Sequence, residues 1–266
     1  MDERLIMDIG VHQGEDTEFY LKKGFRVVGV EAHPELIASA KERLDCYVDG
    51  GRLVLVNAAI SAHAGPVTFF ASESRSVWGT TSQEWAERNQ RLGSRSTKMT
   101  VAGVRAETLL EEYGIPYYMK VDIEGADMLC LEALQRFRDR PAFVSFESTK
   151  TSWSRLLSEF ALLRELGYTR FKVVQQEDVV RQACPFPARE GAYAAHRFEL
   201  GASGMFGEEA PGDWMTEHEA LSVYGKIFNR YRLFGDDGLF KRSRMGRGVM
   251  RLLRPKVGWY DTHAGR

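Results

Sequence analysis

The sequence contains little cysteine and no long apolar segment. Its three cysteines, Cys46, Cys130 and Cys184, are odd in number and widely spaced, and no C-x-x-C pair occurs. This pattern argues against a structural zinc or dithiol redox site and fits a reducing compartment. No apolar run approaches the roughly 20 residues of a membrane-spanning helix, and a first strand that begins by Leu5 leaves no room for a secretory signal. We therefore expect a soluble, cytoplasmic protein without a transmembrane segment.

The chain also lacks an excess of either charge. Its 36 lysines and arginines balance 37 acidic residues, so no overall field attracts nucleic acid, and we expect no nucleic-acid partner. One basic tract, over residues 241–256, contains no acid: Lys241, Arg242, Arg244, Arg247, Arg251, Arg254 and Lys256. Such a tract suits an anionic or lipid-linked acceptor or a membrane surface, although a solvated helix face is the more common outcome.

Apolar strands alternate with amphipathic helices through the first two thirds of the chain. Beyond the strand that begins by Leu5, we expect strands at 26–31, 53–56, 117–122, 142–146 and 168–174, with a short extra strand at 67–71. Asp16 or Thr17 is expected to cap the first helix, and Pro34 to open the second. This alternation predicts an α/β fold with a mainly parallel, doubly wound sheet.

Two segments depart from this alternation. Residues 72–98 are polar and weakly periodic, and we refer to them as the flap. Beyond residue 175 the chain is rich in aromatic residues, with prolines and glycines that predict an irregular segment packed over the sheet. We therefore divide the chain into a core, 1–174, and a C-terminal extension, 175–266, that is expected to help build the acceptor site.

Polar residues gather where the predicted strands end. Asp8 to Gly14 follow the first strand, Glu31 the second and Asn57 the third, and Asp122 and Glu147 end two later strands. Ligands of doubly wound sheets bind beyond these carboxyl ends. The glycines at 10 and 14 would let the backbone pass close to a ligand, and Glu31 would bind a ribose diol through both carboxylate oxygens.

The first loop points to a particular cofactor. Its glycine spacing is G-x-x-x-G and not the dinucleotide pattern G-x-G-x-x-G, and Glu15 and Asp16 follow it. Carboxylates at this position repel phosphate. They suit a phosphate-free adenosine derivative with a positive centre, which is what S-adenosylmethionine offers.

Four sequence blocks resemble the FkbM family of S-adenosylmethionine-dependent methyltransferases. The blocks are Met7-Asp8-Ile9-Gly10 with Gly14, Val30-Glu31-Ala32 with Pro34, Asn57-Ala58-Ala59-Ile60-Ser61 with Gly65, and Met119 to Asp127. They lie between Met7 and Glu147. The resemblance implies a Rossmann-like class I methyltransferase fold and methylation of a hydroxyl group of a sugar or natural product. Many loops of this class have a third glycine at the position where this chain has His12.

The resemblance also implies roles for residues around the cofactor. Asp8, Gly10 and Gly14 would surround its methionine part, together with the loop residue His12 and with Asp122. Glu31 would hold the ribose, next to Ala32. Asn57 and Ala58 would lie near the adenine.

Methyl transfer to an alcohol needs a group that removes the proton of the hydroxyl. We favour Asp122 as base or orienting group, with Glu124 beside it, His12 as the alternative base, and Glu147 completing the set. Lys120, Asp122 and Glu124 could instead brace the turn as an ion-pair network. Two or three of the acids could also hold a divalent cation, so metal dependence stays open.

These expectations define an O-methyltransferase that acts on a saccharide or glycosylated metabolite. A nicotinamide-dependent oxidoreductase or epimerase is the rival enzyme class, and the missing G-x-G-x-x-G disfavours it. A non-catalytic cofactor-binding scaffold is the third hypothesis.

Overall fold

The computed structural model describes residues 1–235, 238 and 258–266. The basic tract at 241–256 therefore lies outside the described residues. No helix in the described ranges is both long and apolar enough to cross a membrane.

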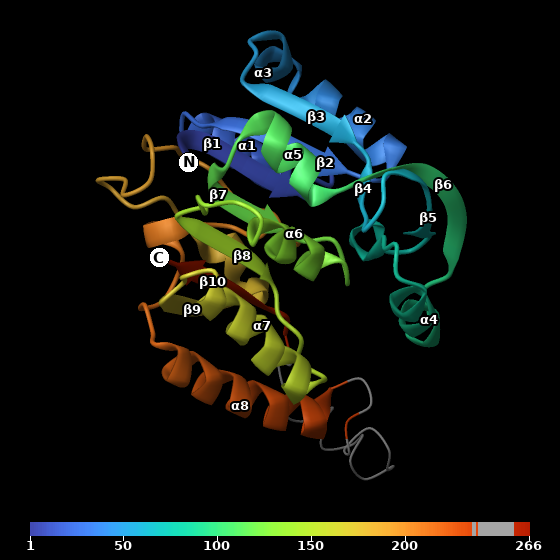
Figure 1. Cartoon of the computed structure of the whole chain (residues 1–266), viewed down its shortest axis with the longest axis vertical. Helices are drawn as coiled ribbons and strands as arrows, with labels where there is room; N and C mark the ends of the chain where they lie inside the picture. The colour runs from blue at the N-terminus through green and yellow to red at the C-terminus, as the bar shows by residue number, and fades with distance from the viewer. Residues whose placement is uncertain (236–237, 239–257) are drawn as a thin grey trace.

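The main sheet has seven strands in the order β3-β2-β1-β7-β8-β10-β9 (Figure 1). Six run parallel, and β10 is antiparallel to both of its neighbours. The strands are β1 (Asp2–Ile9), β2 (Arg26–Glu31), β3 (Leu53–Asn57), β7 (Pro116–Val121), β8 (Phe143–Glu147), β9 (Arg170–Gln175) and β10 (Tyr260–Gly265). The predicted mainly parallel, doubly wound sheet is confirmed.

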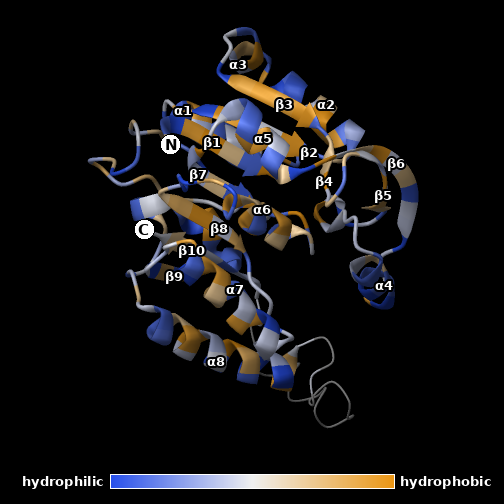
Figure 2. Cartoon of the chain, viewed as in Figure 1, coloured by the Kyte–Doolittle hydropathy of each residue, from blue (hydrophilic) through white to orange (hydrophobic). Residues whose placement is uncertain are grey.

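Helices cover both faces of this sheet. They are α1 (Glu15–Lys22), α2 (Pro34–Arg43), α3 (Asp45–Asp49), α5 (Ala106–Tyr113), α6 (Asp127–Leu134), α7 (Trp153–Glu165) and α8 (Glu217–Phe234). One core cluster packs Leu110, Leu131, Leu163 and Tyr224, from α5 to α8, against the strands. The other packs Phe19 of α1 and residues 194–206 against the opposite face. Figure 2 shows mostly hydrophobic strands, as expected for a sheet buried on both faces.

The chain order creates a ligand-binding edge. From β1 the chain moves outward to β2 and β3, and then returns to β7 on the other side of β1. The carboxyl ends of β1, β2 and β7 therefore diverge around a topological switch point, where such sheets bind ligands.

The flap belongs to a small second sheet beyond this edge (Figure 1). Strands β4 (Ala59–Ile60), β6 (Ser96–Val104) and β5 (Gly65–Ser72) lie side by side in that order, and the connection holds a 3₁₀ turn, Ser76–Trp78, and helix α4 (Gln83–Arg91). The expected excursion is present, but β6 was not predicted. Met99 and Val101 give only a short alternation at the end of a polar stretch.

The C-terminal segment differs from the irregular one that its composition predicts. Residues 182–206 lack long regular elements, but α8 spans 18 residues and starts at a capping box formed by Thr216 and Glu219. Strand β10 enters the main sheet between β8 and β9. The division of the chain at residue 174 stays a prediction.

The start of α1 also differs from the expectation. Neither Asp16 nor Thr17 caps this helix; Gly14 occupies the N-cap position with a φ of 88°. The carboxylate of Asp16 instead accepts hydrogen bonds from the backbone N–H groups of Ser203 (2.8 Å) and Gly204 (3.1 Å). Asp16 thus ties α1 to the C-terminal segment.

Candidate functional site

A cavity of about 780 Å³, open to solvent, lies at the carboxyl ends of β1, β2 and β7. We refer to it as the strand-end cavity. Of the predicted site residues, its lining includes Gly10, His12, Glu31, Ala32, Ala58 and Asp122. Its walls also include Glu15, Asp16, Leu36, Phe69, Lys120, the flap residues Ser76, Val77 and Gly79, and the C-terminal Gly201 and Ala202. The sheet edge therefore brings together Gly10 and His12 after β1, Glu31 and Ala32 at the end of β2, and Asp122 after β7.

The two loop glycines are needed for contacts within the protein. Gly10 has a φ of 93°, and a Cβ there would collide with the carbonyl oxygen of Asp122. Gly14 has a φ of 88°, and a Cβ would lie 2.8 Å from Leu44. Gly10 lines the strand-end cavity, but Gly14 does not. Both glycines therefore let the loop pack closely against other parts of the protein, Asp122 and Leu44. The sequence analysis had expected the ligand, and not the protein, to occupy the space beside them.

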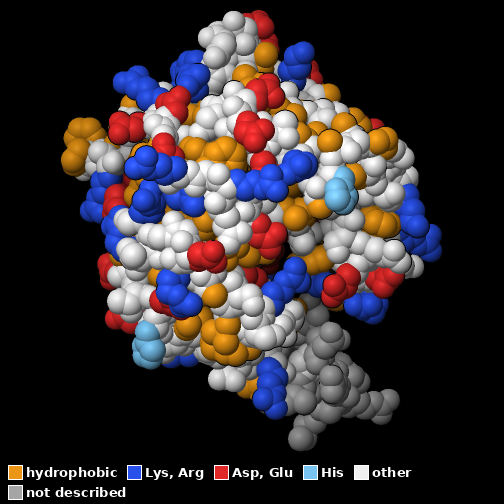
Figure 3. Space-filling view, viewed as in Figure 1, with side chains coloured by type: hydrophobic (Ala, Val, Ile, Leu, Met, Phe, Trp, Pro, Cys, Tyr) orange, Lys and Arg blue, Asp and Glu red, His pale blue; other side chains and the backbone are white. Residues whose placement is uncertain are grey.

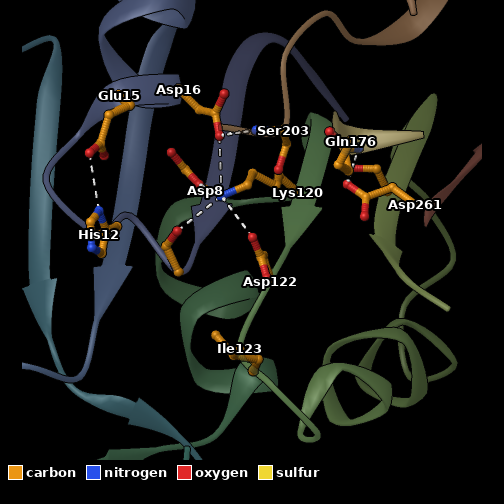
Figure 4. A network of polar contacts seen from close by, with 12 residues as sticks. Asp8, His12, Glu15, Asp16, Lys120, Asp122, Ile123, Gln176, Ser203 and Asp261 are labelled. Carbon is orange, nitrogen blue, oxygen red and sulfur yellow. Dashed lines mark hydrogen bonds and ion pairs between the residues drawn. The ribbon is translucent and has the colours of Figure 1, made fainter. Parts of the chain in front are cut away.

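Lys120 is the centre of a buried charge network at the base of the site (Figure 4). Its ammonium lies 3.3 Å from Asp8 Oδ1, 3.5 Å from Asp16 Oδ2 and 3.9 Å from Asp122 Oδ2. It also donates to the carbonyl oxygen of Gly10 at 3.0 Å. The ion-pair network that the sequence analysis gave as the alternative for Lys120, Asp122 and Glu124 is therefore present in part. Lys120 and Asp122 belong to it, Asp8 and Asp16 are further members, and Glu124 is not one.

Burial and charge shift the pKa values of Lys120, Asp8 and Asp122. Burial alone would lower the pKa of Lys120, but the carboxylates of Asp8, Asp16 and Asp122 outweigh it and raise that pKa. Burial raises the pKa of Asp8 to about 6, against the opposing effect of Lys120. Desolvation in the pocket likewise raises the pKa of Asp122. Asp8 lies inside the protein, where Thr17 Oγ1 donates to it at 2.6 Å, and it does not line the strand-end cavity.

Glu31 is fixed by backbone donors at the end of β2. The N–H of His12 donates to Oε2 at 2.9 Å, and the N–H of His33 donates to Oε1 at 2.8 Å. The side-chain amide of Asn57 donates to the carbonyl oxygens of Glu31 (2.8 Å) and Ala32 (3.2 Å). Asn57 therefore braces the end of β2 outside the cavity lining, whereas its neighbour Ala58 lines the cavity.

His12 connects the first loop to the flap. It has a φ of 55°, its Nδ1 lies 3.1 Å from Glu15 Oε1, and its Nε2 lies 2.8 Å from the hydroxyl oxygen of Ser76. Burial lowers the pKa of His12, but Glu15 outweighs this effect and the pKa is raised. Both ring nitrogens have protein partners, which favours a positioning role over that of a free base.

Glu124 and Glu147 do not join Asp122 in the strand-end cavity. Glu147 lines a second cavity and pairs with Lys150 at 2.6 Å. Glu124 has a φ of 49°, and its Oε2 is buried without a hydrogen-bond partner. Burial and the nearby Glu147 raise its pKa well above the usual range. Such backbone strain is typical of functional loops.

Some site residues were missed by the sequence reasoning. Asp261 of β10 is buried behind the network, and Gln176 Nε2 donates to it at 2.6 Å. Burial, followed by Asp122 and Glu147, raises its pKa. No local pattern marks Asp261, because its position depends on the insertion of β10 beside β8. Gly201 and Ala202 were missed because their position likewise depends on a contact distant in sequence, that of the C-terminal segment with Asp16 of α1.

Comparison with known proteins identifies the family. The family model of the methyltransferase FkbM domain matches residues 8–170, more than half of the chain. The chain belongs to this family. It is therefore an S-adenosylmethionine-dependent methyltransferase, as the sequence blocks indicated. None of the curated proteins matches the sequence.

Solved methyltransferase structures resemble the chain at low identity. Precorrin-6y C5,15-methyltransferase from Geobacter metallireducens is 13% identical, with a TM-score of 0.38 over 66% of this chain and 68% of that one. The C-terminal domain of the enzyme of the same name from Rhodobacter capsulatus is 13% identical, with a TM-score of 0.39 over 73% and 76%. An O-methyltransferase from Bacillus cereus in complex with SAH is 13% identical, with a TM-score of 0.36 over 65% and 67%.

The strand-end cavity fits S-adenosylmethionine in its apolar lining and its charge. Apolar groups for an adenine come from Val30, Leu36, Ala58, Ile60 and Phe69, and carboxylates come from Glu15, Asp16, Glu31 and Asp122. This excess of acids favours a positively charged ligand. Within the described residues, no group of three or more His, Cys, Asp or Glu residues could hold a metal ion.

Loss of the central cation is expected to destabilise the protein. Lys120→Met keeps the length of the side chain but leaves Asp8 and Asp16 buried without their counter-ion, so we expect a loss of about 3 kcal/mol in the free energy of unfolding. Urea denaturation at pH 7 measures this loss. Lys41→Met, at an exposed position on α2, is the matched control. A change in Lys120→Met no larger than in the control would show that the network adds nothing to stability.

Glu159 of α7 is expected to make stability depend on pH. Its side chain is buried, and burial raises its pKa from 4.5 to about 7. The stabilisation that comes from the protonated form is complete below about pH 4.5 and is lost as the pH rises through about 7. Glu159→Gln should therefore gain stability relative to the wild type between pH 4 and pH 8, by about 2 kcal/mol. Urea melts across this pH range, with the exposed Glu165→Gln as control, test the prediction, and parallel curves for Glu159→Gln and the wild type would contradict it.

Proposed function

We propose that this methyltransferase transfers the methyl group to a hydroxyl of a saccharide or glycosylated metabolite, with Asp122 as the general base. One observation carries the proposal. Asp122 is a carboxylate at the base of the strand-end cavity, 41% of its side chain is accessible, and Lys120 holds it from behind at 3.9 Å. The position suits a group that meets an acceptor hydroxyl beside the methyl donor.

Glu31 is proposed as the ribose ligand. Both of its oxygens already accept one backbone N–H, and each can accept a further hydrogen bond from a ribose hydroxyl. A ribose at Glu31 places the adenine near Leu36, Ala58 and Phe69. The amino-acid part then lies toward Asp16, and the methyl group toward Asp122. Asp8, Gly14 and Asn57 support this arrangement through the packing and hydrogen bonds of the two loops.

The reaction needs an electrophile, which the cofactor supplies as a sulfonium-bound methyl, and a proton acceptor, which the protein supplies. The oxygen–methyl bond forms as the sulfur–methyl bond breaks, and the hydroxyl proton passes to Asp122. Desolvation raises the pKa of Asp122 and thereby makes it a stronger base than an ordinary surface aspartate. An alcohol acceptor is favoured because it is the nucleophile that needs such a base.

Membership of the FkbM family argues against the nicotinamide-dependent oxidoreductase or epimerase. A scaffold that binds the cofactor without catalysis differs from the proposed enzyme in one measurable respect. The scaffold needs the cavity but no reactive carboxylate, so only the enzyme depends on the ionisation of Asp122.

Asp122→Asn tests the proposed base. The amide keeps the size of the side chain but cannot accept the proton, so we expect kcat to fall by about 10²–10⁴-fold. Binding of S-adenosylhomocysteine should change by less than about threefold, because Asp122 is not the ribose ligand. The measurements are radiolabelled methyl transfer to a panel of mono- and disaccharides and titration calorimetry. Asp49→Asn, at an exposed position on α3, is the control, and an unchanged kcat in Asp122→Asn would exclude the base role.

Glu31→Gln tests the ribose contact. The neutral amide loses one acceptor oxygen, so we expect the dissociation constant of S-adenosylhomocysteine to rise about tenfold or more. The same titration with NAD should show no binding to the wild type. Glu35→Gln on the neighbouring helix is the control. Equal affinities of Glu31→Gln and the wild type would place the ribose elsewhere.

A further inference from the structure

A second cavity, of about 1420 Å³, lies between helix α4 and the start of α7. We refer to it as the α4–α7 groove. Its lining includes Glu84, Trp85, Arg88 and Arg91 of α4, Gly125, Asp127 and Met128, residues 146–151, Arg155 and Glu159 of α7, and Tyr231. Figure 3 shows basic and acidic side chains next to one another around a recess near the middle of this face.

One loop separates the groove from the strand-end cavity. Asp122, Ile123 and Ala126 face the strand-end cavity, whereas Gly125 and Asp127 line the groove. The two hollows thus share the loop that carries the proposed base. A Cβ at Gly125 would collide with the indole of Trp85, so this glycine lets the flap helix lie directly against the loop.

Two arginines of the groove lack a direct side-chain partner in the described part of the chain, although Arg155 lies close enough to Glu159 to lower its pKa. Neither Arg91 nor Arg155 makes an ion pair or a side-chain hydrogen bond there. Both are exposed, and they come from opposite walls, Arg91 from α4 and Arg155 from α7. Guanidinium groups with free donors are well suited to carboxylate and phosphate oxygens.

The acids of the groove are largely occupied by the protein itself. Glu147 pairs with Lys150 at 2.6 Å. Asp127 accepts the N–H groups of Ile123 (3.2 Å) and Gly125 (3.0 Å), one at each carboxylate oxygen. Glu159 is buried, and its pKa of about 7 removes part of its charge at neutral pH. Glu84 is the remaining acid. The two arginines therefore keep guanidinium donors available to a ligand, while Glu84 and the partly ionised Glu159 offset part of their charge.

We propose that the α4–α7 groove is the acceptor subsite, and that it binds a saccharide through a negatively charged group held by Arg91 and Arg155. The inference rests on the proposed function, because it assumes a saccharide acceptor. It adds the substrate class: a sugar that carries a phosphate, sulfate or carboxylate. The methylated hydroxyl then lies on the part of the acceptor that reaches past the loop toward Asp122.

A binding experiment without turnover tests the subsite. The full chain, saturated with S-adenosylhomocysteine, is titrated with glucose 1-phosphate, glucuronate, neutral glucose and inorganic phosphate, and binding is followed by ligand-observed NMR. We expect at least one of the two anionic sugars to bind about tenfold more tightly than glucose and than inorganic phosphate. Binding should weaken as salt is added.

Two variants and a control locate the anion. Arg91→Ala and Arg155→Ala should each weaken binding of the anionic sugar about tenfold, leaving that of glucose unchanged. Arg138→Ala, an exposed arginine outside both cavities, should change neither. Affinity for S-adenosylhomocysteine and the thermal midpoint should match the wild type in all three variants, because these side chains are exposed.

The possible results separate the two proposals. Equal binding of glucose and both anionic sugars, or unchanged binding in both variants, would overturn the subsite. Inorganic phosphate that binds as tightly as glucose 1-phosphate would overturn the saccharide part of the assignment. Anionic sugars that bind as expected while no hydroxyl is methylated would support the subsite and contradict the proposed O-methyl transfer.

Discussion

The ammonium of Lys120 is the interaction on which the site depends. It draws the carboxylates of Asp8, Asp16 and Asp122 together from β1, α1 and the end of β7. Charges at such distances in a poorly solvated interior interact far more strongly than at the surface. Asp16 extends the network by binding the backbone of Ser203 and Gly204, which brings the C-terminal segment to the edge of the cavity. One cation thus fixes the relative positions of the elements that form the walls.

The loops at the carboxyl ends of β1 and β7 pack against each other on one side and face the strand-end cavity on the other. Gly10 packs against the carbonyl oxygen of Asp122, and the N–H of Asp122 donates to the carbonyl oxygen of Ile9 at 2.8 Å. Strands β1 and β7 are therefore hydrogen-bonded to each other as far as their last residues. Loops that carry chemistry on a rigid sheet of this kind can hold a substrate with little loss of conformational entropy. The flap, which includes helix α4, is attached in contrast through a separate small sheet.

The sequence predicts the strand ends well and the directions of side chains poorly. Glu31 and Asp122 could be placed at the site because the end of a parallel strand is set by hydrophobic pattern and chain order. Asp8 could not be assigned to the interior, because that requires its register opposite Lys120 in the β1–β7 pair. Glu147 is directed to the second cavity for a similar reason. Its neighbour in the sheet, Asp261, lies more than 100 residues away in the chain, and no local pattern reveals such a pairing.

The insertion of β10 has a consequence for the order in which the molecule can be assembled. Strands β8 and β9 belong to the same sheet but do not pair with each other. Both pair with β10, residues 260–265, which lies between them. While the ribosome is still translating residues 176–259, each of these strands presents an unpaired edge, and such edges are templates for intermolecular association. The nascent protein therefore exposes these strand edges until residues 260–265 complete the sheet.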